Sequence, residues 1–179
     1  MHIQSLHIYP VKSLAGVTVD QAPVTRRGLE HDRRWMIVDS AGRFVTRREV
    51  PALATIAVSA EAKGGFQLSS AAGSAPLECM AQPGGELSPV SIWRDTVNAV
   101  VIENDASRLI SEVASTSLRL AFMPDSVRRP VDPIYGAAGD DVSFADGYPV
   151  VVTSRASLAA LNSTLENPVP MERFRPNLV

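Results

Sequence analysis

The chain has 179 residues, of which 45% are hydrophobic and 20% are charged. These fractions are typical of a folded soluble protein and exclude a disordered chain. The formal net charge of −2 excludes the basic excess that general nucleic-acid or membrane-surface binding needs. A local cationic pocket is compatible with this charge, because net charge does not report clustering.

Cys79 is the single cysteine, so no internal disulfide can form, and a reducing compartment is expected. The first residues lack the basic start and the continuous apolar stretch of a signal peptide. No apolar run reaches the roughly 18 residues of a membrane span. We therefore expect a cytoplasmic protein with neither membrane nor nucleic acid as a partner.

Short extended segments dominate the first two thirds of the chain, separated by segments rich in Gly, Ser and Pro. Strands are expected over residues 2–10, 17–19, 22–25, 34–39, 43–46, 56–60, 66–68, 76–80, 88–92, 97–102 and 117–122. A turn with Gly42 at positive φ is expected after the fourth of these, and a helical turn is expected to begin near Pro51. Such spacing predicts a small barrel or sandwich.

Two helices are expected. Asn104 or Asp105 can cap the first, which extends to about Ser115. Ser154 can cap the second, which extends to about Leu165. The buried face of the first is expected to comprise Leu109, Ile110 and Val113, and that of the second Leu158, Leu161 and Leu165.

The remaining segments are less regular. Residues 123–141 predict a long loop or a seam between two units, and residues 142–143 and 150–153 predict extended chain. Residues 177–179 look like the beginning of a strand that has no partner downstream.

Two segments near the N-terminus carry candidates for anion binding. Lys12 and Ser13 follow a strand end, where an ammonium, a hydroxyl and backbone N–H groups could meet an anion; the alternative is a surface lysine. Strand alternation sends Arg33 and Arg34 to opposite faces. The inward arginine needs an anionic partner, which Asp32 or a neighbouring glutamate could supply.

Two further segments carry charge. Residues 44–49 predict a strand end whose charges are mostly solvated. Near the C-terminus, Pro176 favours an extended Arg175, which would place Arg175 and Asn177 on one face. A guanidinium fork and a carboxamide together suit a phosphate and the edge of a heterocycle.

The common catalytic and metal-binding motifs are absent from the sequence. There is no glycine-rich nucleotide loop, no nucleophile elbow and no zinc-protease motif. The three histidines have no metal-ligand spacing, and Cys79 in an apolar strand is expected to be inert core. We predict neither a metal ligand nor a catalytic residue in this chain.

An ordered set of motifs resembles one family. The stretches are YPVKSLAG, RRGLEHDRRWMIVD, FVTRREVPALATI, IWRD, FADGYPVVVTSRASLAALN and RFRPNLV. They resemble the MOSC family with its N-terminal β-barrel domain, which includes the mitochondrial amidoxime-reducing component and bacterial relatives. The resemblance implies a mainly β fold with a few helices (α+β). It implies a MOSC-type β-barrel over residues 1–120 and an incomplete MOSC barrel over residues 121–179.

The resemblance also implies a site for a molybdenum–molybdopterin cofactor between the two parts. The motif positions that it assigns to cofactor binding are Lys12, Ser13, Arg33, Asp146, Arg175 and Asn177. The natural anion for these cations is the pterin phosphate, and Arg34 would be the outward or structural member of its pair.

The implied function is the N-terminal part of a molybdenum-dependent oxidoreductase. It would reduce N-hydroxylated compounds, or transfer sulfur or oxygen, with a small-molecule substrate and an electron-donor redox protein. In the family a cysteine downstream of Asn177 holds the metal, so this chain is expected to be inactive alone. Its unpaired strand edges could support a homo-oligomer.

Two alternatives stay open. One is a non-catalytic module that binds molybdopterin or pyridoxal phosphate, the latter through Lys12, or that serves as a sulfur carrier. The other is a folded remnant whose cations form only internal ion pairs.

Overall fold

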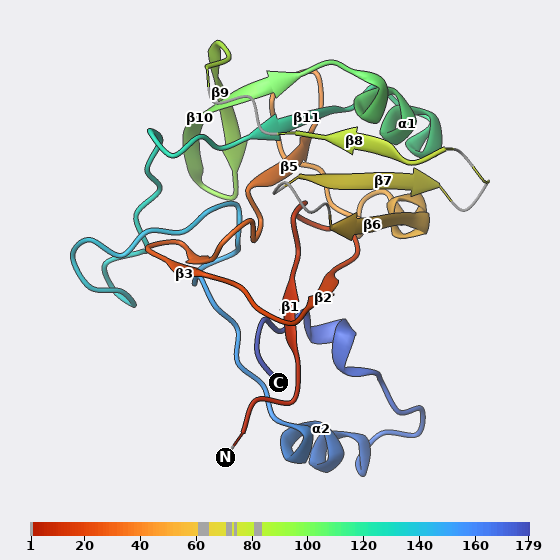
Figure 1. Ribbon diagram of the computed structural model, residues 1–179, viewed down its shortest axis with the longest axis vertical. Coiled ribbons are helices and arrows are strands. Elements are labelled where there is room, and N and C mark those ends of the chain that lie inside the picture. Colours follow the sequence, from red (N-terminus) through yellow and green to blue (C-terminus); the bar gives the residue numbers. More distant parts are fainter. Residues whose placement is uncertain (1, 61–64, 71–72, 74, 81–83) are drawn as a thin grey trace.

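The computed structural model describes residues 2–60, 65–70, 73, 75–80 and 84–179, and these residues are mainly β (Figure 1). The strands are β1 (Leu6–Ile8), β2 (Val17–Val19), β3 (Val24–Thr25), β4 (Gly28–Leu29), β5 (Trp35–Val38), β6 (Ile56–Ala60), β7 (Phe66–Ser70), β8 (Leu77–Cys79), β9 (Leu87–Ile92), β10 (Asp95–Ile102) and β11 (Arg119–Phe122). The helices are α1 (Asp105–Ala114), α2 (Arg155–Asn162) and the 3-10 helices η1 (Pro51–Thr55) and η2 (Met171–Phe174). The mainly β class with a few helices is confirmed.

Two antiparallel sheets form the body of the molecule. One has the order β5-β11-β10-β9, and the other has the order β6-β7-β8. Isolated bridges connect residues 43–45 to both outer strands of the first sheet, through Val38 with Phe44 and Arg43 with Ser91. The expected strand at 43–46 is therefore reduced to single bridges. The described strands do not close into a continuous barrel.

The core follows from the alternation along β5, which is buried on both faces. Trp35 and Ile37 pack with β6, β7, β11 and α1, whereas Met36 and Val38 pack with β9, β10 and Phe144 on the opposite face. A strand with apolar side chains on both faces must lie between two packed layers. The turn after β5 places Gly42 at φ +78, as predicted.

Helix α1 closes one end of the first core. Asn104 caps it by accepting a hydrogen bond from the backbone N–H of Ser107, and Leu109 and Ile110 are buried. Both features were predicted. Ser107 and Ser111 donate to main-chain carbonyl groups, so the polar side chains of this face have partners.

The C-terminal residues pair with the N-terminal ones. Leu6 and Leu178 form an antiparallel bridge, and the backbone N–H of His7 donates to the carbonyl of Asn177 at 2.9 Å. Residues 177–179 are extended as predicted, but their partner lies upstream and not downstream. The expected strand over 2–10 is regular only at β1, because residues 4 and 5 bond to Val179 and not to β2.

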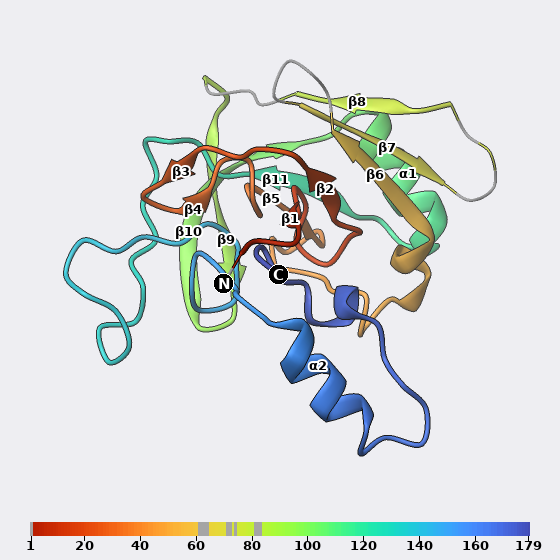
Figure 2. The same ribbon diagram turned by 60° about the horizontal axis from the view of Figure 1, so that its bottom comes forward.

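Helix α2 differs from its prediction. It is capped by Ser154 as expected, but it ends at Asn162 instead of Leu165. None of its residues is buried, and Leu161 is 39% exposed, so the predicted buried face is wrong. Figures 1 and 2 show α2 standing away from both sheets, which leaves its apolar side chains without a layer to pack against.

Two other expected extended segments are irregular. Residues 142–143 contribute a single backbone hydrogen bond, from Val142 to Arg129, and residues 150–153 contribute one parallel bridge, from Val152 to Leu178. Within the part of the chain that is described, no helix has the length and apolarity needed to cross a bilayer.

Candidate functional site

Lys12 and Asp146 form an ion pair at the edge of the first sheet. Lys12 follows β1, and its backbone N–H donates to the carbonyl of Trp35 at 2.8 Å, so the two strand ends hold its position. The indole N–H of Trp93 donates to the same Asp146 carboxylate at 3.1 Å. The Lys12 ammonium also lies 5.4 Å from the centre of the Trp93 ring, which gives a cation–π contact.

The electrostatics of this pair are unequal. Burial lowers the pKa of Lys12, and the hydrogen bond that Lys12 donates to Asp146 offsets the effect only in part. Burial acts to raise the pKa of Asp146, but the hydrogen bond and charge of Lys12 outweigh it, so the pKa of Asp146 is lowered. Asp146 is therefore a carboxylate at neutral pH, occupying the position where Lys12 would meet an anion.

Arg129 fixes the loop that carries Asp146. Its buried guanidinium donates to the carbonyl groups of Ser143 and Ala145, at 3.0 and 2.7 Å, and to the Asp95 carboxylate at 2.7 Å. The backbone N–H of Phe144 donates to the Arg33 carbonyl at 2.9 Å. The loop at 143–146 is thereby held against the segment that contains Arg33.

A buried network joins Asp32, Arg33 and Asn177. The Arg33 guanidinium pairs with the Asp32 carboxylate at 2.5 Å and donates to the Asn177 side-chain oxygen at 2.9 Å. The Asn177 amide donates to Asp32 at 3.0 Å and to the His7 carbonyl at 3.1 Å. Asn177 has no exposed surface and also accepts from the backbone N–H of Val151, so the protein itself uses its hydrogen-bonding capacity.

Arg33 and Arg34 turn to different partners as expected, but both precede β5 and Arg33 has φ 47°, so strand alternation is not the cause. Arg33 is buried and takes Asp32 as its partner, which was one of the two candidates. Arg34 donates to the Met123 carbonyl and pairs with the exposed Asp125 at 2.9 Å. Arg34 therefore makes a structural contact with the segment that follows β11.

Arg175 is the one predicted site cation that lacks a carboxylate within ion-pair distance among the described residues. Its guanidinium donates to the Leu14 carbonyl and lies 4.2 Å from the centre of the Tyr9 ring. Its second terminal nitrogen, Nη2, is buried without any hydrogen-bond partner. Arg33 lies 4.6 Å from the same Tyr9 ring and donates to the Arg175 carbonyl at 3.0 Å.

The charge around Arg175 is positive. Burial, followed by the charges of Arg33 and Arg47, lowers the pKa of Arg175 to about 10. Arg47 is half-buried, and no ion pair or hydrogen bond of its side chain is found in the described residues. The charges of residues 44–49 were predicted to be mostly solvated. The concentration of positive charge around Arg175, to which Arg47 contributes, was not predicted.

The backbone of the site is unusual. Ser13, Arg33, Trp93 and Arg175 all have φ between 47° and 73°, in the left-handed region that non-glycine residues rarely adopt. Such conformations cost about 1–3 kcal/mol each and gather at binding and active sites. Four of the six such non-glycine residues in the described part of the chain belong to the candidate site, and the other two are His31 and Ser115.

The prediction that Pro176 makes Arg175 extended is wrong. Arg175 has φ 53° and ψ 49°, because it caps η2 and its N–H returns to the Glu172 carbonyl. Proline disfavours the right-handed helical region at the preceding residue, and the left-handed region satisfies this constraint as well. Arg175 and Asn177 consequently turn to different partners.

Ser13 lies beside Lys12, half-buried, and no hydrogen bond of its hydroxyl is found in the described part of the chain. Sequence reasoning missed Tyr9, whose ring contacts two guanidinium groups, and Trp93, which donates to Asp146. Tyr9 begins and Trp93 lies within quoted motifs, which was the available signal. Cys79 is buried in β8 within the hydrophobic core, and burial raises its pKa to about 12.

Comparison with known proteins gives a consistent family. The MOSC N-terminal beta barrel domain matches residues 1–117, and the MOSC domain matches residues 139–179. Mitochondrial amidoxime-reducing component 1 of Mus musculus is 31% identical over 191 residues, covering 99% of this chain and 54% of the relative. Molybdenum cofactor sulfurase of Oryza sativa subsp. japonica is 28% identical over 201 residues, covering 100% of this chain and 24% of the relative.

The chain spans about half the length, or less, of these curated relatives. The first family model alone matches most of the chain, and its order with the second agrees with the motif order in the sequence. The chain therefore belongs to the MOSC family of proteins that carry the MOSC N-terminal beta barrel domain.

Proposed function

We propose that this chain binds the phosphate-bearing part of a molybdenum–molybdopterin cofactor. The observation that carries the proposal is Arg175. It is a largely enclosed guanidinium with an unpartnered Nη2 and no carboxylate partner in the described structure, next to Arg33 and Arg47. A buried donor without an acceptor is costly, and a phosphate oxygen would supply that acceptor.

The residues divide into those that would contact the phosphate and those that position them. Arg175 and Lys12 would donate charge-assisted hydrogen bonds, and Ser13 would add its hydroxyl. Asn177 is fully occupied within the protein and would orient Arg33 instead of meeting the ligand. Asp146 pairs with the Lys12 ammonium. An entering anion must therefore bind the ammonium together with Asp146 or displace Asp146 from it.

The residues fit the phosphate but not the metal. In the family a cysteine thiolate holds the molybdenum, whereas Cys79 is 1% exposed and its thiol has a pKa of about 12. When bound, the cofactor supplies the oxidation–reduction chemistry, and the protein supplies binding and electrostatics. We propose that the metal's thiolate is not contributed by this stretch of chain, which by itself would be inactive.

In a longer protein of this family the same residues would serve an oxidoreductase. We propose reduction of N-hydroxylated compounds, or related sulfur or oxygen transfer, with electrons from a redox protein. The support is the similarity to amidoxime-reducing components and to molybdenum cofactor sulfurases.

The test is retention of pterin by the chain purified from a bacterium that makes molybdopterin. Bound pterin is measured as its fluorescent oxidation product in the wild type, in Arg175→Gln and in Arg119→Gln. Arg119 is the control because its guanidinium also donates to main-chain carbonyl groups, those of Asp39 and Ser40. Loss of one charge-assisted hydrogen bond predicts a roughly 10- to 100-fold loss of pterin in Arg175→Gln alone. Equal pterin in both variants would refute the proposal.

A second candidate is a Schiff base between Lys12 and pyridoxal phosphate. It gains support from the burial that lowers the pKa of Lys12, since a neutral amine is the nucleophile. Borohydride reduction of the chain with pyridoxal phosphate, followed by mass spectrometry, should then label Lys12. An unlabelled Lys12 would remove this candidate.

A further inference from the structure

A cavity distinct from the cationic site is lined by residues of β1, β4, β5, β7 and β11 and of the loops beside them. Its volume is about 520 Å³, within the range of small-molecule sites. Arg34 lines it, whereas Lys12, Arg33, Asp146 and Arg175 do not. Arg33 therefore belongs to the cationic site, whereas Arg34 belongs to this cavity.

The floor of this cavity is aromatic. Trp35, Phe66 and Phe122 line it, and the Trp35 ring is 5.4 Å from that of Phe66 and 4.9 Å from that of Phe122. Ile8 and Leu29 add aliphatic surface. The three rings are 2–6% exposed, so they form the floor of the cavity and face it with a small part of their surface.

The rim of the cavity is charged, and most of its charges are compensated. Arg128 makes three hydrogen bonds to the buried Asp141, at 3.0 to 3.2 Å, and Arg34 pairs with Asp125. Arg26 lies 3.8 Å from Asp141. The remaining acid, Glu30, is half-exposed beside His31.

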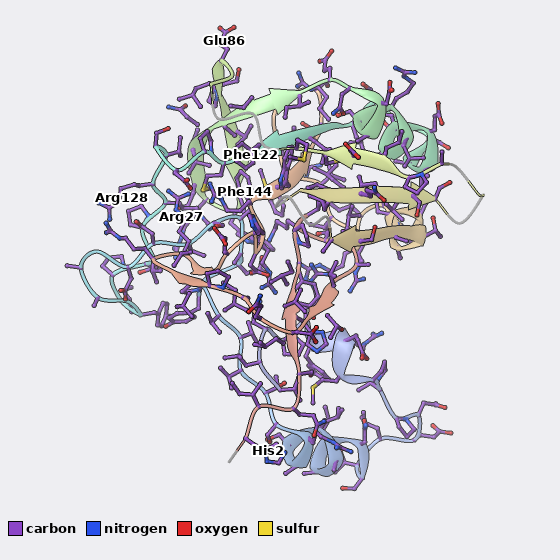
Figure 3. All side chains as sticks on the ribbon, in the orientation of Figure 1. His2, Arg27, Glu86, Phe122, Arg128 and Phe144 are labelled. Carbon is purple, nitrogen blue, oxygen red and sulfur yellow. The ribbon has the colours of Figure 1, made fainter. Side chains whose placement is uncertain are left out.

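Arg27 is the exception on this rim. Its guanidinium donates only to the main-chain carbonyl groups of Pro124, Asp125 and Val127, and no ion pair of Arg27 is found among the described residues. Burial is the main cause of its lowered pKa and the charge of Arg34 lowers it further, whereas the charges of Asp125 and Asp141 raise it. Figure 3 shows Arg27 and Arg128 on the same flank of the molecule, with Phe122 nearer its centre.

One polar group without a partner lines the cavity among the described residues. The Ser143 hydroxyl is buried and has no hydrogen-bond partner, and Ser143 is 1% exposed. An unpartnered hydroxyl and a guanidinium without an ion pair, set around an aromatic floor, match a ligand with a flat apolar body and one acidic group.

We propose that this cavity binds a small aromatic carboxylate or a similar apolar anion. The aromatic floor formed by Trp35, Phe66 and Phe122 takes the ring system, and Arg27 takes the acidic group. This site is independent of the cofactor proposal, because none of the residues proposed to contact the cofactor phosphate lines it.

The test compares two probes of the same shape, 1-naphthoate and 1-naphthamide, by isothermal titration calorimetry on the whole chain. The wild type should bind 1-naphthoate at least about tenfold more tightly, since one charge-assisted hydrogen bond separates the probes. Arg27→Gln should remove this preference, whereas Arg27→Lys should keep part of it. Phe122→Leu should weaken both probes, and Arg119→Gln should change neither.

Three results would overturn the proposal. They are no binding of 1-naphthoate to the wild type, equal binding of the two probes to the wild type, and loss of 1-naphthoate binding in Arg175→Gln. The first two need no variant and are unaffected by any misfolding of Arg27→Gln. The third would place the probe in the cationic site instead of this cavity.

Discussion

Lys12 and Asp146 are 134 residues apart in the sequence and form an ion pair in which the side-chain exposures are 8% and 71%. The buried partner is the cation and the accessible partner is the anion. An incoming anion can therefore reach Lys12 by displacing a carboxylate that water can readily solvate. This asymmetry would allow the pair to serve as a binding site.

Replacing Asp146 by Asn should lower the pKa of Lys12 further, because the carboxylate is the main group that raises it. The free energy of unfolding should fall by roughly 1–2 kcal/mol, between the values for exposed and buried pairs. NMR with 13C-labelled lysine reports the pKa directly, since Lys63 gives the only other lysine signal.

The control for Asp146→Asn is Asp105→Asn, which breaks an exposed pair with Arg108 on α1. The free energy of unfolding of Asp105→Asn should fall by less than about 1 kcal/mol. An Asp146→Asn variant that leaves the Lys12 signal unmoved would contradict the ion pair.

Asn177→Ala should destabilise the protein by about 2–4 kcal/mol, because Asp32 and Arg33 would each lose a buried partner. Urea denaturation measures this change. Asn162→Ala is the matched control. It removes two hydrogen bonds to Val169 in a peripheral segment and should cost about 1 kcal/mol. Equal losses of unfolding free energy in the two variants would show that the Asn177 network stabilises the protein no more than the peripheral hydrogen bonds of Asn162.

The pH dependence of stability should carry a contribution from Lys12. Its folded pKa is lowered from 10.5, so between that lowered pKa and 10.5 the unfolded chain holds a proton that the folded chain has released. Stability therefore rises with pH across this window. The difference in urea midpoint between the wild type and Lys12→Met isolates the effect, since Tyr9 and Arg175 titrate in both proteins. A difference that stays flat or falls with rising pH would contradict it.

The Cys79 thiol should be almost inert in the native protein. Its pKa is raised from 9.0 to about 12, which lowers the thiolate fraction near neutral pH about 1,000-fold. Reaction with a disulfide reagent such as Ellman's reagent should be slow until urea unfolds the chain. Rapid stoichiometric reaction of the native protein would reopen Cys79 as a metal ligand.

Much of the fold could be predicted because local signals determined it. The turn at Gly42, the Asn104 cap and the strands β5 and β6 follow from residue chemistry and apolar patterning. The buried face expected for α2 failed for a different reason. Its leucines have suitable spacing, but whether a face is buried depends on a neighbouring layer, and α2 stands outside the sheets.

The candidate site was predictable in its cations and not in their pairing. The motifs indicated Lys12, Arg33 and Arg175, whereas their partners lie far along the chain or, for Arg175, are not found in the described residues. Which arginine is left without a counter-charge depends on three-dimensional packing. The left-handed backbone of Arg33 and Arg175 likewise depends on tertiary contacts that no local pattern encodes.

If Arg175 receives a phosphate, NMR of the arginine Nε–H groups should detect it. The wild-type chain is titrated with inorganic phosphate, and the signal of Arg175 is compared with that of Arg119. We expect a saturable shift at Arg175 and a negligible shift at Arg119. An unmoved Arg175 signal, or equal shifts at both arginines, would contradict it.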